Sequence, residues 1–255
     1  MTACGSFLQV EIPQQLTIMI SRRTTRNIGC FSQDLEAMSS LSKRVSLQLV
    51  GFSLGSLGWI LSCITTRHAE WRLWLVDNTT IFSSGIAHVG IWKICFPPNL
   101  KISSDYGIVC CHEFNFNENF FPVEMFLAQI LLLIATFLGG LGIFFTLLPP
   151  WHFYMGTIRK TQAICLFLAG GILYIIAGLC VLVPVSWNFY SAANNSSIPF
   201  PPSFHLPSFP VAQKIGIAIP LGISSGLMLL ISGIIFLYIR SPVTSIRVNP
   251  VNPRS

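Results

Sequence analysis

Three cysteines, Cys95, Cys110 and Cys111, lie in a polar stretch between two long apolar runs. Their thiols can form a disulfide. One disulfide, from Cys95 to either Cys110 or Cys111, can form if this stretch lies in an oxidising compartment. It would close a loop of about 15 residues, which is worth roughly 3 kcal/mol in the chain-entropy description of disulfides. The sequence therefore predicts one disulfide and one remaining cysteine in this stretch.

The run Cys110-Cys111-His112-Glu113 contains metal-ligating side chains, but its spacing matches neither a zinc ribbon nor the His-Glu-x-x-His motif. The five histidines are scattered, and none belongs to an acid–base pair or a nucleophile motif. A glycine-rich phosphate loop is also missing. We therefore predict no metal site, no cofactor and no enzymatic activity.

Charged residues make up only 9% of the chain, against roughly 25% in soluble domains. The charges are clustered and leave four neutral gaps, each long enough for a membrane-spanning helix of about 20 residues. Because proline interrupts a helix, Pro149-Pro150 should end the second span and a loop should follow Pro184. The predicted spans are residues 45–66, 123–147, 162–184 and 214–239.

Lysine and arginine near the span ends indicate the orientation, because they gather on the cytoplasmic side of a membrane. One side carries Lys43, Arg44, Arg159, Lys160, Arg240, Arg247 and Arg254. Both termini are therefore predicted to be cytoplasmic, with loops 67–122 and 186–213 outside. The net charge of +6 is then a signal of topology and not of nucleic-acid binding. Residues 1–44 form an N-terminal extension with little expected fixed structure, and 240–255 form a short tail.

Small residues recur four apart in the first span, as Gly51-x-x-x-Gly55, and in the fourth span, as Gly222-x-x-x-Gly226. Such spacing lets helices approach closely in a membrane. We favour packing within one bundle over a seam between two copies. The polar Gln129 in the second span is expected to hydrogen-bond a loop or a neighbouring helix.

Three segments of the first outer loop have the composition of β-strands, at residues 71–76, 88–96 and 106–114. Asn78, Asn194 and Asn195 each begin an N-glycosylation triplet. All three asparagines lie in segments that the charge distribution places outside the cell.

Trp71, Gly90-Ile91-Trp92, Cys95 and Cys110 together resemble the claudin signature of Trp, Gly-Leu-Trp, Cys and Cys in the first extracellular loop. The similarity extends over residues 45–239, so that this chain resembles a divergent claudin. It implies an all-α membrane protein with a left-handed four-helix transmembrane bundle. A small extracellular antiparallel β-sheet would top the bundle, with four strands from the first loop and one from the second.

The resemblance also implies roles for the signature residues. Trp71 and Trp92 would anchor the sheet near the membrane. Cys95 and Cys110 would form the family disulfide, with Cys111 as the alternative partner. The position just after the second signature cysteine, where some pore-forming members carry charge, is then Cys111.

The implied function is that of a structural cell-adhesion protein. It would polymerise with itself and other claudins, within one plasma membrane and across facing cells, into tight-junction strands that control paracellular permeability. Membrane lipid is a further expected partner, and nucleic acid is not. Auxiliary subunits of channels or receptors, of the gamma-subunit and peripheral-myelin types, share the signature and supply the alternative function.

Three departures from the family pattern stand out. The family's arginine near the top of the second helix is Gln129 here. In the second loop the motif Asp-Phe-Tyr-Asn-Pro is replaced by a run in which Phe204, His205 and Pro207 are the candidate contact residues. The chain ends in Arg254-Ser255 without the hydrophobic residue that PDZ domains capture, so PDZ-scaffold binding is not expected.

Overall fold

The computed structural model describes residues 14–76, 85–96, 110–114, 122–154, 160–200 and 212–239. The chain forms two compact units, residues 1–46 and residues 47–255. Helix α1 (Gln14–Arg67) contributes to both units, and the second unit holds every other element.

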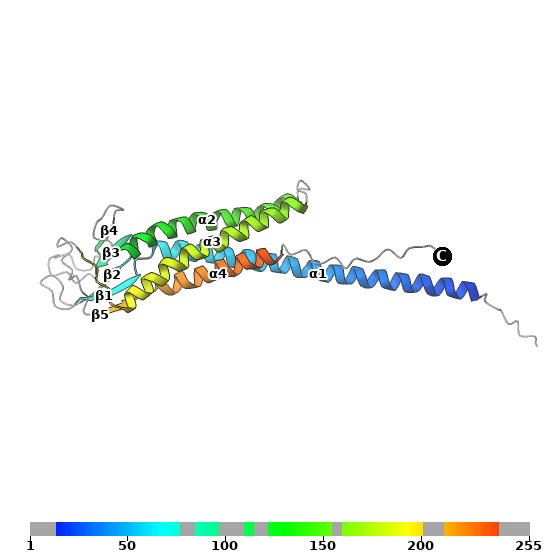
Figure 1. The fold of residues 1–255 in the computed structure, drawn as a ribbon, viewed down its shortest axis with the longest axis horizontal. Coiled ribbons are helices and arrows are strands. Elements are labelled where there is room, and N and C mark those ends of the chain that lie inside the picture. Colours follow the sequence, from blue (N-terminus) through cyan, green and yellow to red (C-terminus); the bar gives the residue numbers. More distant parts are fainter. Residues whose placement is uncertain are drawn as a thin grey trace, which may run out of the picture. The chain divides into compact units, whose positions relative to one another are not determined.

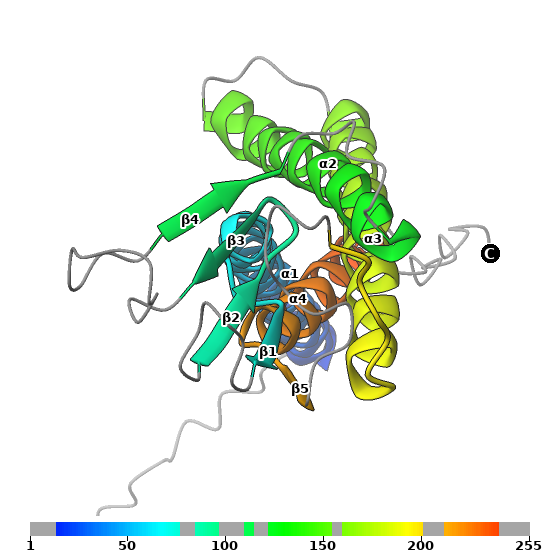
Figure 2. The same ribbon diagram turned by 90° about the vertical axis from the view of Figure 1, so that its left-hand side faces the viewer.

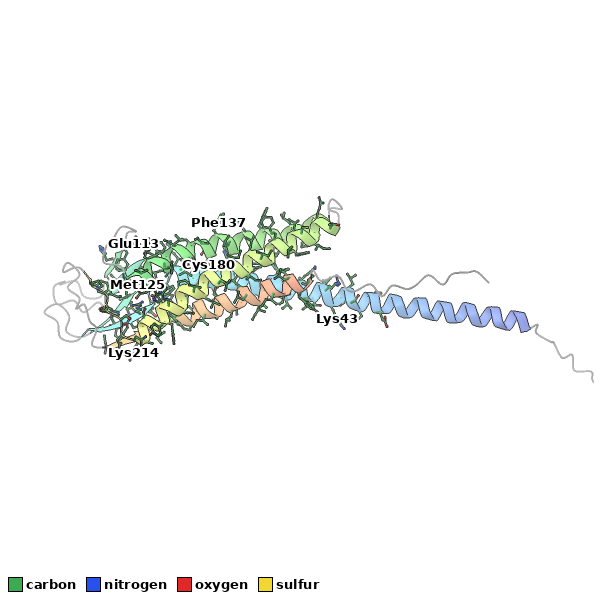
Figure 3. The ribbon with its side chains drawn as sticks, in the orientation of Figure 1. Lys43, Glu113, Met125, Phe137, Cys180 and Lys214 are labelled. Carbon is green, nitrogen blue, oxygen red and sulfur yellow. A yellow bond between two sulfur atoms is a disulfide. The ribbon has the colours of Figure 1, made fainter. Side chains whose placement is uncertain are left out.

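Four helices in the described residues are long and apolar enough to cross a membrane, as the sequence predicts. They are α1, α2 (Val123–Tyr154), α3 (Lys160–Ala193) and α4 (Ala218–Ile239), labelled in Figure 1. Large apolar side chains point outward from the bundle. Phe137 on α2 is 66% exposed and lies on the outer side of that helix (Figure 3). Lipid would cover these side chains in a bilayer.

Two of the predicted helix ends are wrong. Helix α2 continues through Pro149-Pro150, and α3 continues through Pro184. A proline removes one hydrogen-bond donor, and a membrane helix tolerates this loss where neighbouring groups compensate. Helix α3 ends instead at Ala193, and Asn195, two residues later, has a left-handed φ of 50°. There Ser196 N donates to Ser191 O at 3.0 Å, a Schellman-type end.

The start of α4 also differs from the prediction, by four residues. Residues 212–215, partly assigned to the fourth span from the sequence, form strand β5 (Ala212–Ile215). Pro220 then falls in the first turn of α4, where its missing N–H costs no helical hydrogen bond.

The N-terminal extension was predicted to have little fixed structure, but α1 already begins at Gln14. Pro13 precedes this start, and Gly29 is the one glycine or proline between Gln14 and Val50. The segment thus has a single residue that disfavours a helix, and its charges, on which the prediction relied, do not prevent helix formation.

The second unit contains a five-stranded antiparallel sheet in the order β4-β3-β2-β1-β5. The other strands are β1 (Arg72–Val76), β2 (Gly85–Val89), β3 (Lys93–Phe96) and β4 (Cys110–Glu113), seen along the bundle in Figure 2. As the family resemblance implies, four strands come from the first inter-helix stretch and one from the second. The single strand predicted at 88–96 is divided into β2 and β3 by a turn, in which Gly90 N donates to Lys93 O at 2.9 Å.

Small residues join α1 to α4 through backbone contacts. Ser232 Oγ donates to Gly51 O at 2.7 Å, and Ser225 Oγ donates to Gly58 O at 2.8 Å. A Cβ added at Gly55 would lie 2.7 Å from Ser232 Oγ. These glycines therefore pack inside one bundle, as the sequence analysis favoured.

We predict that Gly55→Ala lowers the free energy of unfolding by about 1–3 kcal/mol, because the added methyl group overpacks the helix contact. The matched control is Gly140→Ala, where the nearest neighbour of an added Cβ lies at 3.7 Å. That change should be neutral or stabilising by up to about 1 kcal/mol, since alanine favours a helix. Thermal unfolding in detergent measures both, and equal effects at the two positions would contradict the packing described.

Candidate functional site

The sheet is tied to the helices by a buried cation, Arg72, the first residue of β1. Its side chain is 0% exposed. Arg72 Nη2 donates to Glu124 Oε1 at 3.1 Å and to Asn188 Oδ1 at 2.9 Å. Glu124 lies in the first turn of α2 and Asn188 near the end of α3, so one guanidinium joins three elements.

Each partner of Arg72 is itself held in place. Glu124 is near the positive end of the α2 dipole, which favours a carboxylate. Asn188 Nδ2 donates to Glu124 O at 3.1 Å and to Pro184 O at 3.0 Å. Asn188 can reach this position because α3 continues beyond Pro184.

Burial lowers the pKa of Arg72, and the Glu124 carboxylate opposes that shift through a hydrogen bond and its charge. Arginine stays protonated in proteins because its ordinary pKa is far above neutrality. Arg72 therefore contributes a buried positive charge at physiological pH.

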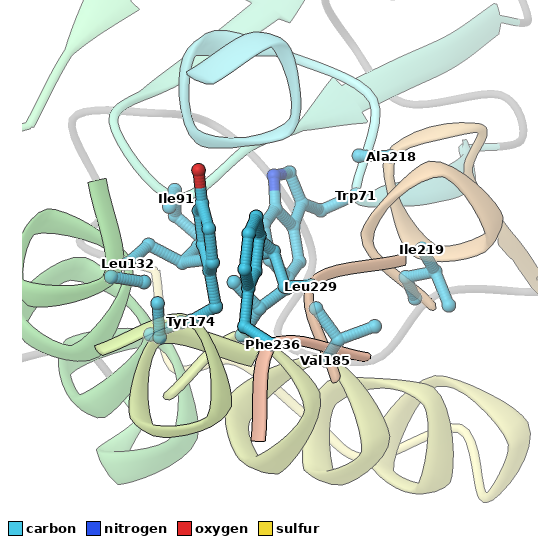
Figure 4. Close-up of a cluster of buried hydrophobic side chains, with 13 residues drawn as sticks. Trp71, Ile91, Leu132, Tyr174, Val185, Ala218, Ile219, Leu229 and Phe236 are labelled. Atoms are coloured by element: carbon cyan, nitrogen blue, oxygen red, sulfur yellow. The ribbon is translucent and has the colours of Figure 1, made fainter. Parts of the chain in front are cut away.

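Trp71, immediately before β1, fixes the sheet from inside the bundle. The residue is 0% exposed, and its indole N–H donates to Thr65 O at 3.1 Å. The ring lies in a cluster with Ile91, Leu132 and Val185 (Figure 4). Trp92 packs against that cluster. Residues from α2, α3 and the β2–β3 turn thus surround one tryptophan.

Two glycines allow the sheet and its connections to approach closely. A Cβ added at Gly90 would lie 2.9 Å from Ala69 Cα. Any side chain at residue 90 would therefore clash with the backbone that leads into β1. A Cβ added at Gly216 would collide with the carbonyl oxygen of Glu70. Gly216 N donates to Trp71 O at 3.0 Å. The sequence analysis did not predict a role for Gly216. The one feature of the sequence that could have indicated it is a glycine directly after a strand.

Gln129, which is 2% exposed, links α2 to the β2–β3 turn. Its Nε2 donates to Ile91 O at 2.6 Å. The expected bond to a loop is therefore present, although glutamine is a neutral donor and the family's arginine a charged one.

The disulfide joins Cys95 to Cys111, with a Cα–Cα distance of 4.1 Å. The pairing with Cys110 that the resemblance implied is thus wrong, and the alternative partner is bonded. In the β3–β4 register Cys95 is directly opposite Cys111, whereas Cys110 is opposite Phe96. A shift of one residue along a strand moves a side chain to the other face of the sheet, which excludes Cys110.

This register also changes which residue follows the second bonded cysteine. With Cys111 as the second cysteine, the residue just after it is His112, followed by Glu113. Both side chains are exposed on β4, at the end of the sheet, and Glu113 is marked in Figure 3.

The remaining candidate residues are not all in the described part of the chain. Asn194 and Asn195 are exposed at the end of α3, and Asn195 Oδ1 accepts a hydrogen bond from Gln213 N at 3.2 Å. Outside the described residues lie Asn78, Phe204, His205 and Pro207.

Residues 56–238, which include all of these elements except the N-terminal part of α1, match the family model described as PMP-22/EMP/MP20/Claudin tight junction. The chain belongs to this family. Claudin-1 of Rattus norvegicus is 28% identical over 141 residues, which cover 55% of this chain and 64% of claudin-1. Claudin-7 of the same species is 24% identical over 187 residues, covering 73% and 82%. Claudin-2 of Canis lupus familiaris is 26% identical over 198 residues, covering 76% and 78%.

Family membership and the four apolar helices make this chain a divergent claudin-family protein that passes the membrane several times. In the first of these comparisons the chain spans less than two thirds of the relative's length. The segment that matches the family model, residues 56–238, includes Trp71, the Gly90 turn, both bonded cysteines and the helix residues that hold Arg72.

We predict that Arg72→Gln lowers the free energy of unfolding by about 3–5 kcal/mol, because it leaves the Glu124 carboxylate, whose side chain is only 12% exposed, without its cation. The matched control is Arg67→Gln, since Arg67 is exposed at the end of α1 and should contribute less than about 1 kcal/mol. Thermal unfolding and the amount of protein at the cell surface measure both. A stable Arg72→Gln protein would contradict the anchoring role.

For the disulfide, Cys111→Ser should lower the free energy of unfolding by about 3 kcal/mol through the loss of loop constraint. Cys110→Ser is the matched control and should keep the bond to Cys95. Mass spectrometry of non-reduced peptides identifies the pairing directly. A Cys95–Cys110 peptide in the unsubstituted protein would refute the β3–β4 register.

Proposed function

We propose that this claudin-family chain is a structural adhesion protein that polymerises into tight-junction strands and controls paracellular permeability. The observation that carries the proposal is the sheet itself. Five strands are fastened to the bundle by Trp71, Arg72 and Gln129, although the last replaces the family's arginine. A rigid sheet is what one copy would present to its neighbours.

The sheet end of the bundle is proposed to face the cell exterior, with both termini in the cytoplasm. The Cys95–Cys111 disulfide supports this orientation, because such bonds persist in oxidising compartments. The excess of lysine and arginine beyond the opposite span ends supports it too. Glycans on Asn194, Asn195 or Asn78 would be consistent with it.

The proposed partners are other copies of this chain and other claudins, within one membrane and, through Phe204, His205 and Pro207, across facing cells. Rat claudin-1 and claudin-7 and dog claudin-2 are the relatives that support this class. Membrane lipid would cover the apolar outer faces of the helices. Binding of PDZ scaffolds by the C-terminus is not part of the proposal.

Expression of the tagged full chain in fibroblasts without tight junctions tests strand formation. Freeze-fracture imaging of cell contacts should show continuous strands with the unsubstituted chain and with Cys110→Ser. Trp71→Ala should remove them, because the sheet loses its buried anchor. Surface protein without strands would contradict self-assembly, and co-purification with a single large channel would then favour an auxiliary subunit.

His112 is proposed to influence ion selectivity, because it follows the second bonded cysteine, where some pore-forming claudins carry charge. We predict that His112→Lys shifts permeability in an epithelium towards anions and His112→Asp shifts it towards cations, by simple charge attraction. Dilution potentials measure the shift. Lys93→Gln, on the neighbouring strand β3, is the control for general charge effects. Identical selectivity of the two His112 variants would exclude this position from the ion path.

A further inference from the structure

Helix α1 begins well before the part of the chain that matches the family. The match begins at residue 56, whereas the helix begins at Gln14. The first bundle contacts of α1 described above are those of Gly51 and Gly55. The function proposed above does not use the helical residues that precede them, 14–50.

The sequence of this segment contains a heptad repeat. Apolar residues recur at alternating intervals of three and four, with Ser42 as the one polar residue in the series. The series is Ile28, Phe31, Leu35, Met38, Ser42, Val45, Leu49 and Phe52. A period of 3.5 residues is typical of helices that pair along a seam, since it keeps one stripe facing a partner.

Three apolar residues of the stripe before Phe52 have exposed side chains. Met38 is 68% exposed, Val45 is 47% exposed and Leu49 is 63% exposed. The series begins in the extension and includes Leu49 of the membrane span, and its last residue, Phe52, packs against the bundle core.

The charges of this segment lie off the stripe. With Ile28 at heptad position a, Glu36 and Lys43 fall at b, Arg44 at c and Asp34 at g. In a parallel pair, a g residue meets the next e residue of the partner, and that e residue is Ser39. Two identical stripes can therefore meet without burying a charge and without like charges in contact.

We propose that the α1 helices of two copies pair through this stripe as a parallel coiled coil at the cytoplasmic membrane surface. A second copy fits because two copies in one membrane hold their first spans at the same height and in the same direction. Identical stripes then meet in register. The membrane surface is a less suitable partner for the stripe. To lie on it, the helix would have to bend into the membrane plane, and residues 30–50 contain no glycine or proline at which it would bend.

Cysteine cross-linking of the full chain in native membranes tests the proposal. In a background with Cys4→Ser, Cys30→Ser, Cys110→Ser and Cys165→Ser, one cysteine at a time is introduced at stripe residues Phe31, Leu35 and Met38. Matched controls are Gln33→Cys and Ser40→Cys, both at heptad position f. Mild oxidation should yield several-fold more disulfide-linked dimer from the stripe positions than from the controls. Equal yields at all five positions would overturn the proposal.

A second pair of variants separates pairing from misfolding. Leu35→Asp with Met38→Asp should reduce energy transfer between two differently labelled full chains by several fold while surface delivery stays normal. Gln33→Asp with Ser40→Asp adds the same charge and should leave the transfer unchanged. Unchanged transfer in both variants would refute the coiled coil. Protection of the stripe cysteines from aqueous maleimide without cross-linking would refute it too, by indicating burial in lipid.

Discussion

The buried charge of Arg72 is the constraint on which the rest of the second unit depends. Removing an ion from water costs several kcal/mol, and a partner must offset this cost through geometry. Here the partners come from two helices, Glu124 of α2 and Asn188 of α3. Its Nε and Nη1 atoms have no hydrogen-bond partner in the described structure, so the guanidinium is only partly compensated. The position of β1 is therefore specified by the ends of α2 and α3 together.

Several other features keep the sheet close enough to the helices for this contact. Gly90 and Gly216 have no side chain, so their backbones can lie directly against the backbone that precedes β1 and contains Trp71. The Cys95–Cys111 disulfide fixes the register of β4 at the far end of the sheet. Gln129 holds the β2–β3 turn on α2 with a neutral hydrogen bond. Besides this neutral hydrogen bond, which stands where the family has an arginine, Arg72 makes a charged contact between the sheet and the helices. Its bond to Asn188 is possible because α3 continues beyond Pro184.

The sequence predicted the membrane spans well because apolar length and missing charge are physical requirements of a bilayer. It predicted helix ends poorly, since a proline such as Pro184 removes one hydrogen bond and does not by itself end a helix whose next residues find partners. The choice between Cys110 and Cys111 depended on strand register, which adjacent cysteines do not encode. The family signature identified Trp71 and Gly90, whereas the joint role of Arg72, Glu124 and Asn188 requires contacts across 52 and 116 residues of sequence.

A double-mutant cycle between Arg72 and Glu124 tests the central claim most directly. Thermal unfolding in detergent would be measured for Arg72→Gln, Glu124→Gln and the double variant. If the pair anchors the sheet, the double variant should be about 2 kcal/mol more stable than the sum of the single effects predicts, because the second change removes a charge that the first left unpaired. Single effects that add within about 0.5 kcal/mol would show that the two residues act independently, and would contradict the account.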